Sequence, residues 1–223
     1  MICCCGAEEE EVVEEAPVVS VLGGSEPGEL VKTSALQAPR KLSGPGRSFT
    51  VTIEATRETG LVLDDLDSRG PVIASIPEGA VQDFNAKNPA SAVCPNDLIL
   101  AVNSVEGEVK SIIQQLQSLD KTALTLKILR PQEMNISMGK KPNASLGLQM
   151  NFSSFSAGAV VDMIAESGVA HAWNESQPEE KRLRRGDRLV AIDGQYLKGE
   201  EMIEALKQKK GQECDLDLTI LRY

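Results

Sequence analysis

A few side chains in this sequence have the chemistry of nucleophiles or general bases, but the pattern around each of them is unlike a catalytic site. His171 is the only histidine, and no Cys or Asp pattern surrounds it, so we expect a surface or capping role. Ser137 and Lys140 have the Ser-x-x-Lys spacing of some acyl-transfer enzymes, yet the other motifs of those enzymes are absent from the sequence. Cys94 and Cys214 have no neighbouring histidine to generate a thiolate. We therefore expect no catalytic residue and no enzyme activity.

Cofactor chemistry is not indicated either. The sequence contains no phosphate-binding glycine loop, dinucleotide fingerprint, zinc motif or calcium loop, so we expect no cofactor, no metal and no small-molecule substrate. The net charge of −10 disfavours nucleic acid, since binding there depends on Lys and Arg that neutralise phosphates. The basic stretch 181–188 suggests contact with phosphoinositide headgroups, but a solvated loop balanced by nearby glutamates is the favoured interpretation.

The amino-terminal residues suggest a covalent modification. Cys3, Cys4 and Cys5 are consecutive and lack the spacing of a metal site; a cysteine cluster of this kind is typical of S-palmitoylation, and the alternative is an unmodified tail. Glutamates begin at Glu8, and an anionic membrane surface would repel them, so acyl chains would have to anchor the chain alone.

The localisation expected from the sequence follows from two absences. No apolar run reaches the ~18 residues of a membrane span, and the start of the sequence lacks the basic and then apolar profile of a signal peptide. We expect a cytoplasmic protein, placed at the cytoplasmic face of a membrane if the cysteines are acylated.

An internal repeat determines how the rest of the chain is organised. Three motifs recur in the same order with offsets of 90, 92 and 87 residues: Asn96–Asn103 with Gly186–Asp193, Leu124–Arg130 with Leu216–Arg222, and Thr59–Leu61 with Leu146–Leu148. Such self-similarity indicates one module that occurs twice. We predict a disordered acidic tail over 1–47, whose Pro, Gly, Ser and Glu residues have no sustained period, a first domain over 48–131 and a second over 132–223.

Hydrophobic periodicity predicts the same elements in both copies. In the first copy, strands are expected at 48–53, 61–66, 72–76, 98–102 and 124–129, with helices at 80–88 and 109–119. In the second copy, strands are expected at 134–138, 148–151, 159–164, 189–192 and 216–221, with helices at 169–173 and 200–208. The helix at 109–119 is the clearest prediction, because its apolar residues recur at positions 0, 3, 4 and 7.

With these motifs in place, each copy resembles a PDZ domain. The family's Gly-Asp-x-Ile-Leu-x-Val-Asn-Gly motif is similar to 96–103 and matches 186–194 almost letter for letter, and Thr59-Gly60-Leu61 and Leu146-Gly147-Leu148 match the Φ-Gly-Φ core of its carboxylate-binding loop. The resemblance covers nearly everything outside the tail. It implies an α+β, mainly β fold: two PDZ-like, partly open antiparallel β-barrels, each capped by two helices.

The resemblance also implies a binding site in each copy. A partner's C-terminal peptide would add as a strand along the groove between one edge strand and the second helix, and backbone N–H groups around the glycine would bind its carboxylate. The carboxylate-loop residues would be Thr59, Gly60, Leu61, Leu146, Gly147 and Leu148, with the pairing strands at 61–66 and 148–152. The groove residues would be Val62, Leu63, Val109, Ile113, Leu116, Gln149, Met150, Gly199, Ile203 and Leu206.

The residue that contacts the ligand's third-from-last side chain sets the expected specificity. It falls at Val109 in the first copy and at Gly199 in the second, so neither copy has the histidine that many family members use to select Ser or Thr. Val109 with Ile113 predicts an apolar preference, whereas Gly199 gives no clear preference. Thr59 departs from the family's usual Leu.

Three functions are consistent with these features. The first is a non-enzymatic scaffold or adaptor that binds C-terminal peptides and is tethered to a membrane through acylated cysteines. The second is a structural or regulatory subunit whose grooves bind no peptide. The third is an enzyme, such as a protease, whose catalytic part would have to lie in a segment outside this sequence. The first is the favoured hypothesis.

Overall fold

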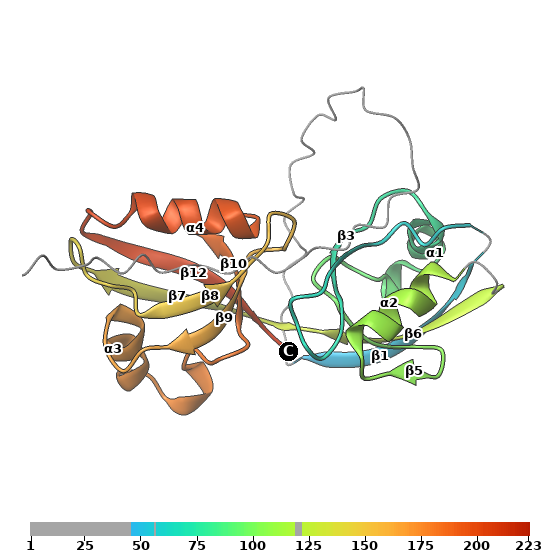
Figure 1. Cartoon of the computed structure of the whole chain (residues 1–223), viewed down its shortest axis with the longest axis horizontal. Coiled ribbons are helices and arrows are strands. Elements are labelled where there is room, and N and C mark those ends of the chain that lie inside the picture. The colour runs from blue at the N-terminus through green and yellow to red at the C-terminus, as the bar shows by residue number, and fades with distance from the viewer. Residues whose placement is uncertain (1–45, 56, 119–121) are drawn as a thin grey trace, which may run out of the picture.

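The computed structural model describes residues 46–55, 57–118 and 122–223. Residues 1–45 of the acidic tail expected over 1–47, with their cysteines, therefore lie outside the described residues, and Arg47 already belongs to the first strand. The described chain forms two sheet-and-helix units that follow one another in sequence and lie side by side (Figure 1).

The first unit has six strands, two α-helices and one short 3-10 helix. They are β1 (Arg47–Glu54), β2 (Val62–Asp64), β3 (Val72–Ser75), α1 (Ala80–Lys87), η1 (Pro89–Ser91), β4 (Leu98–Val102), β5 (Val105–Glu106), α2 (Val109–Gln117) and β6 (Ala123–Arg130). The sheet order is β1-β6-β4-β3-β2, with β5 paired to β4, and every pairing is antiparallel. The short strand β2 is therefore an edge.

The second unit repeats this arrangement. Its elements are β7 (Gln132–Lys140), β8 (Leu148–Asn151), β9 (Ala159–Ile164), α3 (Val169–Glu175), η2 (Glu179–Lys181), β10 (Arg188–Ile192), β11 (Gln195–Tyr196), α4 (Gly199–Gln208) and β12 (Cys214–Arg222). The sheet order is β7-β12-β10-β9-β8, with β11 paired to β10. Each strand of the first unit thus has its counterpart six strands later, and β8 is the edge that corresponds to β2.

Each unit encloses its own aliphatic core. In the first unit the alternating residues of β1 and β6 face inward, and Ile112 of α2 is fully buried among them. In the second unit Met202 of α4 and Met138 of β7 occupy the core. Aromatic residues make up only 3% of the sequence, and the two cores consist mainly of Ile, Leu, Val, Ala and Met side chains.

One buried ion pair occurs in both units and explains why the motif at 96–103 and 186–193 contains Asp. The carboxylate of Asp97 accepts hydrogen bonds from the Nε and Nη2 of Arg130 at 2.8 and 2.7 Å. Asp187 accepts from the same two atoms of Arg222 at 2.8 and 2.7 Å. In both units the pair joins the start of β4 or β10 to the end of the last strand, and bidentate geometry makes it a strong contact. Burial, partly offset by the Arg130 hydrogen bonds, raises the pKa of Asp97.

The two units are joined by a single residue. β6 ends at Arg130, β7 begins at Gln132, and Pro131 between them is buried. Figure 1 shows that the chain passes from the first sheet directly into the second. This junction leaves little freedom for the units to separate, because Pro131 has a fixed φ and both neighbours are committed to strands.

A charged contact also holds the units together. Arg188, the first residue of β10, is fully buried and forms an ion pair with Asp64 at the end of β2 in the other unit; their side chains are 1% and 2% exposed. The Nη1 of Arg188 also donates to the carbonyl of Ala157 at 3.2 Å. Among the described residues, its Nε and Nη2 have no hydrogen-bond partner. Arg188 takes the motif position that Leu98 has in the first copy. The same position is therefore apolar in one unit and an inter-unit ion pair in the other.

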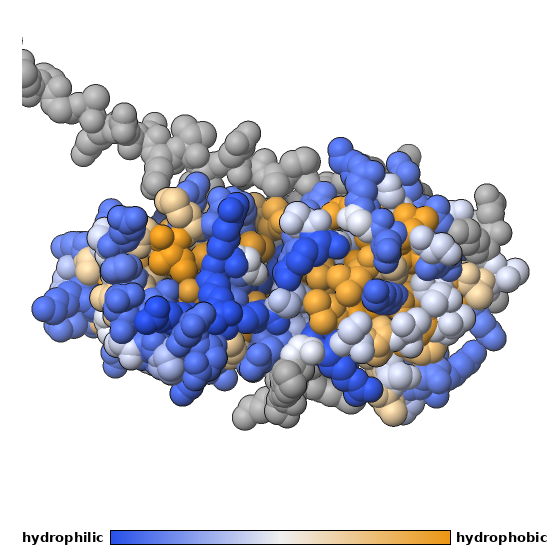
Figure 2. Space-filling model, turned by 90° about the horizontal axis from the view of Figure 1, so that it is seen from below, coloured by the Kyte–Doolittle hydropathy of each residue, from blue (hydrophilic) through white to orange (hydrophobic). Residues whose placement is uncertain are grey.

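Tyr223 adds a second group of contacts at the same junction. Its hydroxyl donates to the carbonyl of Asn96 at 2.9 Å, and its backbone carbonyl accepts from the Nη1 of Arg69 at 3.0 Å. The Arg69 guanidinium also lies over the Tyr223 ring, 5.3 Å from its centroid. Burial raises the pKa of the Tyr223 phenol. Figure 2 shows hydrophilic side chains between the two units on the face seen from below.

The expected fold class is confirmed: two antiparallel, unclosed sheets, each with two helices. The structure corrects some bounds, since the edge strand predicted at 61–66 is only β2 and the helix predicted to end at 119 ends at Gln117. Asp64 ends β2 because its carboxylate accepts from the Leu66 N–H at 2.9 Å, which turns the chain. In the described residues, no helix has both the length and the apolar character to cross a membrane.

Candidate functional site

The second unit has an open groove between its edge strand and its second helix. A cavity of about 770 Å³ lies there. One side is formed by residues of 143–152, which include the Φ-Gly-Φ loop and β8, and the other by Ile203, Leu206, Lys207 and Lys210. β8 is the end strand of its sheet, so the backbone groups on its outer side are available for another strand to pair with.

Backbone geometry turns a set of N–H groups toward the end of this groove. The carbonyls of Ser145, Leu146 and Gly147 accept hydrogen bonds from Val169, Ala170 and Ala165, at 3.0, 3.0 and 2.9 Å. In a planar trans peptide, the next N–H points opposite to the carbonyl. The N–H groups of Leu146, Gly147 and Leu148 therefore point away from α3 and β9. Such a convergent set of donors binds a carboxylate without a cationic side chain. The Gly147 N–H is 3.3 Å from the Ser145 hydroxyl oxygen, which is an acceptor a ligand can replace.

A second glycine makes this loop possible, and the sequence analysis did not select it. Gly147 has φ of +73°, and a Cβ there would lie 2.4 Å from the carbonyl oxygen of Ser167. Gly168, the residue before α3, packs against it, and a Cβ on Gly168 would lie 3.0 Å from the Cα of Gly147. The first unit has the same device, since a Cβ on Gly79 would lie 2.6 Å from the Cα of Gly60. The offset between Gly79 and Gly168 matches that of the repeat, so the sequence could have identified this pair of glycines.

The groove is apolar at its centre and cationic at its loop end. Leu146, Leu148, Met150, Ile203 and Leu206 are half-buried and line it. Lys207 and Lys210 stand at the rim near the loop and are exposed. This arrangement suits a chain end with an apolar last side chain and a free carboxylate, because the apolar surface takes the side chain and the lysines attract the charge.

Lys140 fixes the position of that end of the groove. It is only 6% exposed, and its Nζ lies 2.8 to 3.3 Å from four backbone carbonyls, those of Lys141, Lys209, Lys210 and Gln212. The ammonium thus ties the segment that follows α4 to the end of β7. These contacts give a structural role to the lysine of the Ser137-x-x-Lys140 spacing.

The corresponding groove of the first unit is more closed. Leu61, Leu63, Ile113 and Leu116 are 5 to 6% exposed, whereas their counterparts in the second unit are half-buried. The helix start there also turns the carbonyls of Glu58 and Thr59 inward, since Ala80 and Val81 donate to them. The first loop thus directs the N–H groups of Thr59 and Gly60 outward, but its apolar groove is packed into the core.

The structure brings the predicted residues of each copy together around one edge strand and one helix, with one exception. Val62 and Leu63 lie on β2, Gln149 and Met150 on β8, and both strands have a β-bulge between these two residues. Val109 packs half-buried against the first core. Gly199 is absent from the cavity lining, because it faces the β8–β9 turn. Phe152, which the sequence analysis placed at the end of the pairing strand, lines the cavity beyond β8.

The basic stretch 181–188 is occupied by contacts within the chain. Arg182 donates to the carbonyl of Gln177, and Arg184 to that of Glu179. Arg185 pairs with Asp162 at 2.8 Å, and Arg188 is buried against Asp64. Arg182, Arg184 and Arg185 thus contact the folded chain, whereas Arg188 is buried; balance of the stretch by the nearby glutamate side chains stays a prediction. Among the described residues, no group of three or more His, Cys, Asp or Glu is arranged to hold a metal ion.

Comparisons with known proteins give structural matches only. No protein-family model matches the sequence, and no curated protein matches it. Among solved structures, the complex of INAD PDZ45 with NORPA CC-PBM is 18% identical, with a TM-score of 0.35, over 83% of this chain and 97% of that chain. INAD PDZ45 in complex with an NG2 peptide is 18% identical, with a TM-score of 0.33, over 87% and 95%. MUPP1 PDZ4 is 17% identical, with a TM-score of 0.33, over 41% and 76%.

At these scores and identities, the assignment of the fold rests on the topology of the chain itself. Both units have the same element order and strand pairing, a glycine loop that opens the edge strand, and a helix opposite that strand. These are the features that the sequence motifs imply. Each of the two units of the described chain therefore has a PDZ-like fold.

Proposed function

We propose that this protein is a non-enzymatic scaffold whose second unit binds the C-terminal segment of partner proteins in the groove between β8 and α4. The observation that carries this proposal is the set of N–H groups of Leu146, Gly147 and Leu148 at the end of an open apolar cavity. A peptide would add to the free edge of β8, with main-chain hydrogen bonds supplying affinity and the cavity taking its last side chain.

The first unit has a different part in this proposal. Its groove residues are already packed into the core, so a peptide would have to displace apolar contacts before it could bind. The structural alternative therefore applies to the first unit: it supports and orients the second through the Asp64–Arg188 pair and the Pro131 junction.

The test uses the full chain and a library of peptides with free C-termini, measured beside the same peptides amidated. Binding that is lost on amidation supports carboxylate capture by the loop. No binding, or binding indifferent to amidation, refutes the proposal and favours a role in which both units are structural.

A matched pair of variants locates the site. Leu206→Glu places a carboxylate in the cavity, where it repels the ligand's own carboxylate and makes the apolar surface polar. Gln208→Glu adds the same charge two residues away on the same helix, at an exposed position outside the cavity. We expect Leu206→Glu to weaken binding at least about tenfold and Gln208→Glu to change it little. Gly147→Glu is a poorer test, because any Cβ there collides with the Ser167 carbonyl.

Membrane tethering through Cys3, Cys4 and Cys5 stays part of the proposal on the sequence alone. Labelling cells with an alkyne analogue of palmitate should mark the wild-type chain and leave a variant with all three cysteines changed to Ser unmarked. Equal labelling of the two proteins, or no labelling of either, would refute the tether and leave the peptide-binding proposal intact.

A further inference from the structure

The second sheet has another free edge besides β8. β7 is the end strand on the opposite side of the sheet order, and β12 is the only strand that pairs with it among the described residues. β7 has nine residues, whereas β8 has four. A long strand with an unpaired side is a template on which another strand can pair. β7 therefore offers a larger surface for strand addition than the peptide groove does.

The strand register shows which backbone groups of β7 face outward. Asp217 of β12 lies opposite Ser137. The Asp217 carbonyl accepts from the Asp193 N–H at 2.7 Å, and the Asp217 N–H donates to the Asp193 carboxylate at 3.3 Å, so both groups point away from β7. Facing residues in an antiparallel pair either bond each other or both point apart. The N–H and carbonyl of Ser137 therefore point to the free edge, and by alternation so do those of Asn135 and Gly139.

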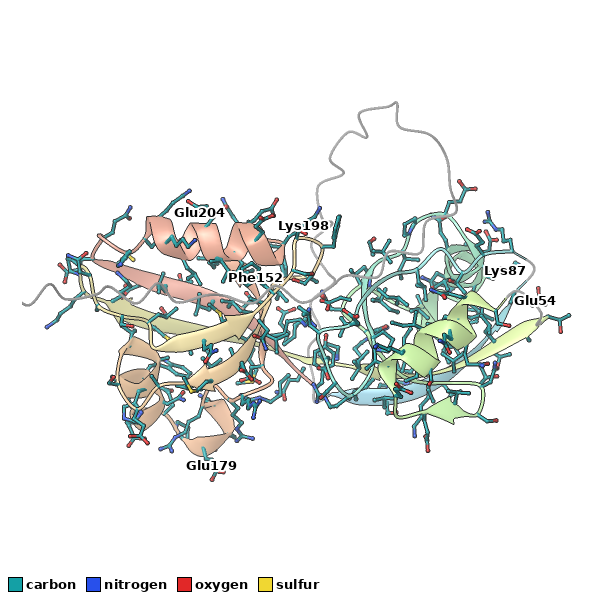
Figure 3. The ribbon with its side chains drawn as sticks, viewed as in Figure 1. Glu54, Lys87, Phe152, Glu179, Lys198 and Glu204 are labelled. Carbon is teal, nitrogen blue, oxygen red and sulfur yellow. The ribbon has the colours of Figure 1, made fainter. Side chains whose placement is uncertain are left out.

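A groove, here called the β7–α3 groove, follows this free edge. It consists of two cavities of about 610 and 440 Å³ that share Trp173 of α3 as a wall, and β7 lines both of them. Of the described residues, only Ala144 and Ser145 line both this groove and the peptide groove. Figure 3 shows Glu179, which follows α3, and Glu204 of α4 on opposite sides of the second unit. The two grooves therefore present different surfaces to a ligand.

The chain that precedes the first unit reaches the fold at one end of the β7–α3 groove. A Cβ on Gly46 would lie 3.9 Å from the backbone nitrogen of Gln132, the first residue of β7. Upstream, the sequence contains the run Val18–Leu22, bounded by a proline and two glycines. Its valines favour a strand, and the flanking residues are typical strand boundaries. Residues 23–45 reach about 75 Å when extended, well beyond the ~30 Å length of β7.

We propose that Val18–Leu22 adds to β7 as an antiparallel strand and occupies the β7–α3 groove. Its main-chain groups bond the outward-facing groups of β7, and its aliphatic side chains cover the apolar lining around Met138 and Trp173. This inference concerns a different surface from the proposed peptide site and does not depend on peptide binding.

The antiparallel direction follows from the two ends of the segment. It places Leu22 at the Gln132 end of β7, which is the end that Gly46 approaches. It also brings the glutamates at 14 and 15 toward Lys141, an exposed residue that lines the other end of the groove. Opposite charges there favour the antiparallel direction over the parallel one.

The first experiment measures amide hydrogen exchange of the full chain by mass spectrometry. In Val19→Pro/Ser20→Pro, two consecutive prolines remove a main-chain donor whichever residue faces β7. Thr33→Pro/Ser34→Pro is the matched control within residues 23–45. We expect fragments that cover 134–139 to exchange at least about tenfold faster in the first variant and at the wild-type rate in the control. Equal rates in the wild-type chain and the first variant, or equal acceleration in both variants, overturn the inference.

The second experiment distinguishes this segment from a second copy of the chain, which could pair its own β7 with this edge. Exchange of the same fragments is measured over about a hundredfold dilution, beside sedimentation velocity at the same concentrations. We expect protection of β7 to be independent of concentration, because an intramolecular contact does not obey mass action between chains. Protection that falls on dilution together with a dimer assigns the edge to a second copy and overturns the inference.

The third experiment tests the groove from its helix side. Ala172→Glu places a carboxylate in the groove from an exposed position on α3, whereas Gln208→Glu adds the same charge at an exposed position on α4, outside both grooves. We expect Ala172→Glu to accelerate exchange in the fragments that cover 134–139 and Gln208→Glu to leave it unchanged, with thermal melts reporting the folded fraction of both. If exchange in Ala172→Glu equals that of the wild-type chain, the segment does not lie in this groove.

Discussion

The Asp64–Arg188 pair gives the sharpest prediction about stability. Both side chains are almost fully buried, and two of the guanidinium nitrogens lack a hydrogen-bond partner in the described chain. If one partner is replaced, the other remains as an uncompensated buried charge, which typically costs about 3–5 kcal/mol. We therefore expect Asp64→Leu and Arg188→Met each to lower the free energy of unfolding by about that amount.

The double variant should behave in the opposite way. Replacing both members of a buried pair with apolar side chains of similar volume is often neutral or stabilising by about 1–4 kcal/mol. The unpaired nitrogens of Arg188 favour that outcome, because each buried donor without a partner costs about 1–3 kcal/mol. Leu98 at the same motif position of the first copy shows that this fold accepts an apolar residue there.

Urea denaturation measures these differences with two probes. Trp173, the only tryptophan, reports the second unit through fluorescence, and circular dichroism reports both units. Arg185→Met is the control. The Arg185 side chain is 80% exposed in its ion pair with Asp162, so this variant should lose no more than about 1 kcal/mol. The reasoning is refuted if the single variants lose no more than this control, or if the double variant is less stable than both singles.

Three further outcomes are expected. Lys140→Met should lower the free energy of unfolding measured in urea by about 2–3 kcal/mol, because several carbonyls lose a charged donor. The control Lys141→Met, at an exposed position, should have almost no effect. Equal losses in the two variants would contradict the role of the buried ammonium. Burial acts to raise the pKa of Asp67, but its hydrogen bonds to Arg69 outweigh this and lower it. The stability contributed by the Asp67 carboxylate is therefore present above the ordinary Asp pKa and is lost as the pH falls toward the folded-state pKa. In Asp67→Asn, a plot of melting temperature against pH should become flatter below about pH 4. A plot identical to that of the wild-type chain would refute this. Leu98→Arg introduces a buried cation without the carboxylate that Arg188 has, and should lower the melting temperature by several degrees in a thermal scan; an unchanged melting temperature would show that the site can solvate the charge.

The sequence predicted those elements whose side chains repeat with a clear period. The helix α2 was recognised because Val109, Ile112, Ile113 and Leu116 recur on one face, and the second Gly-Asp motif predicted the turn before β10. The end of α2 was less clear, since no glycine or proline follows Gln117 closely.

Features that depend on distant residues were not predictable. The Asp64–Arg188 pair joins residues 124 positions apart, and neither lies in a pattern that names its partner. Gly199 was interpreted as a groove position from the family resemblance, but a glycine has no side chain whose pattern shows which surface it faces. Only the structure shows that it packs against Ser156.

The junction at Pro131 has a consequence for how this protein can be cut. Proteases act on exposed chain that can unfold locally, and multidomain proteins usually offer such chain between their domains. Here the chain leaves β6 and enters β7 across one buried residue. Limited digestion should therefore remove loops or ends but release no intact halves, and in a cell neither unit would be supplied without the other by proteolysis.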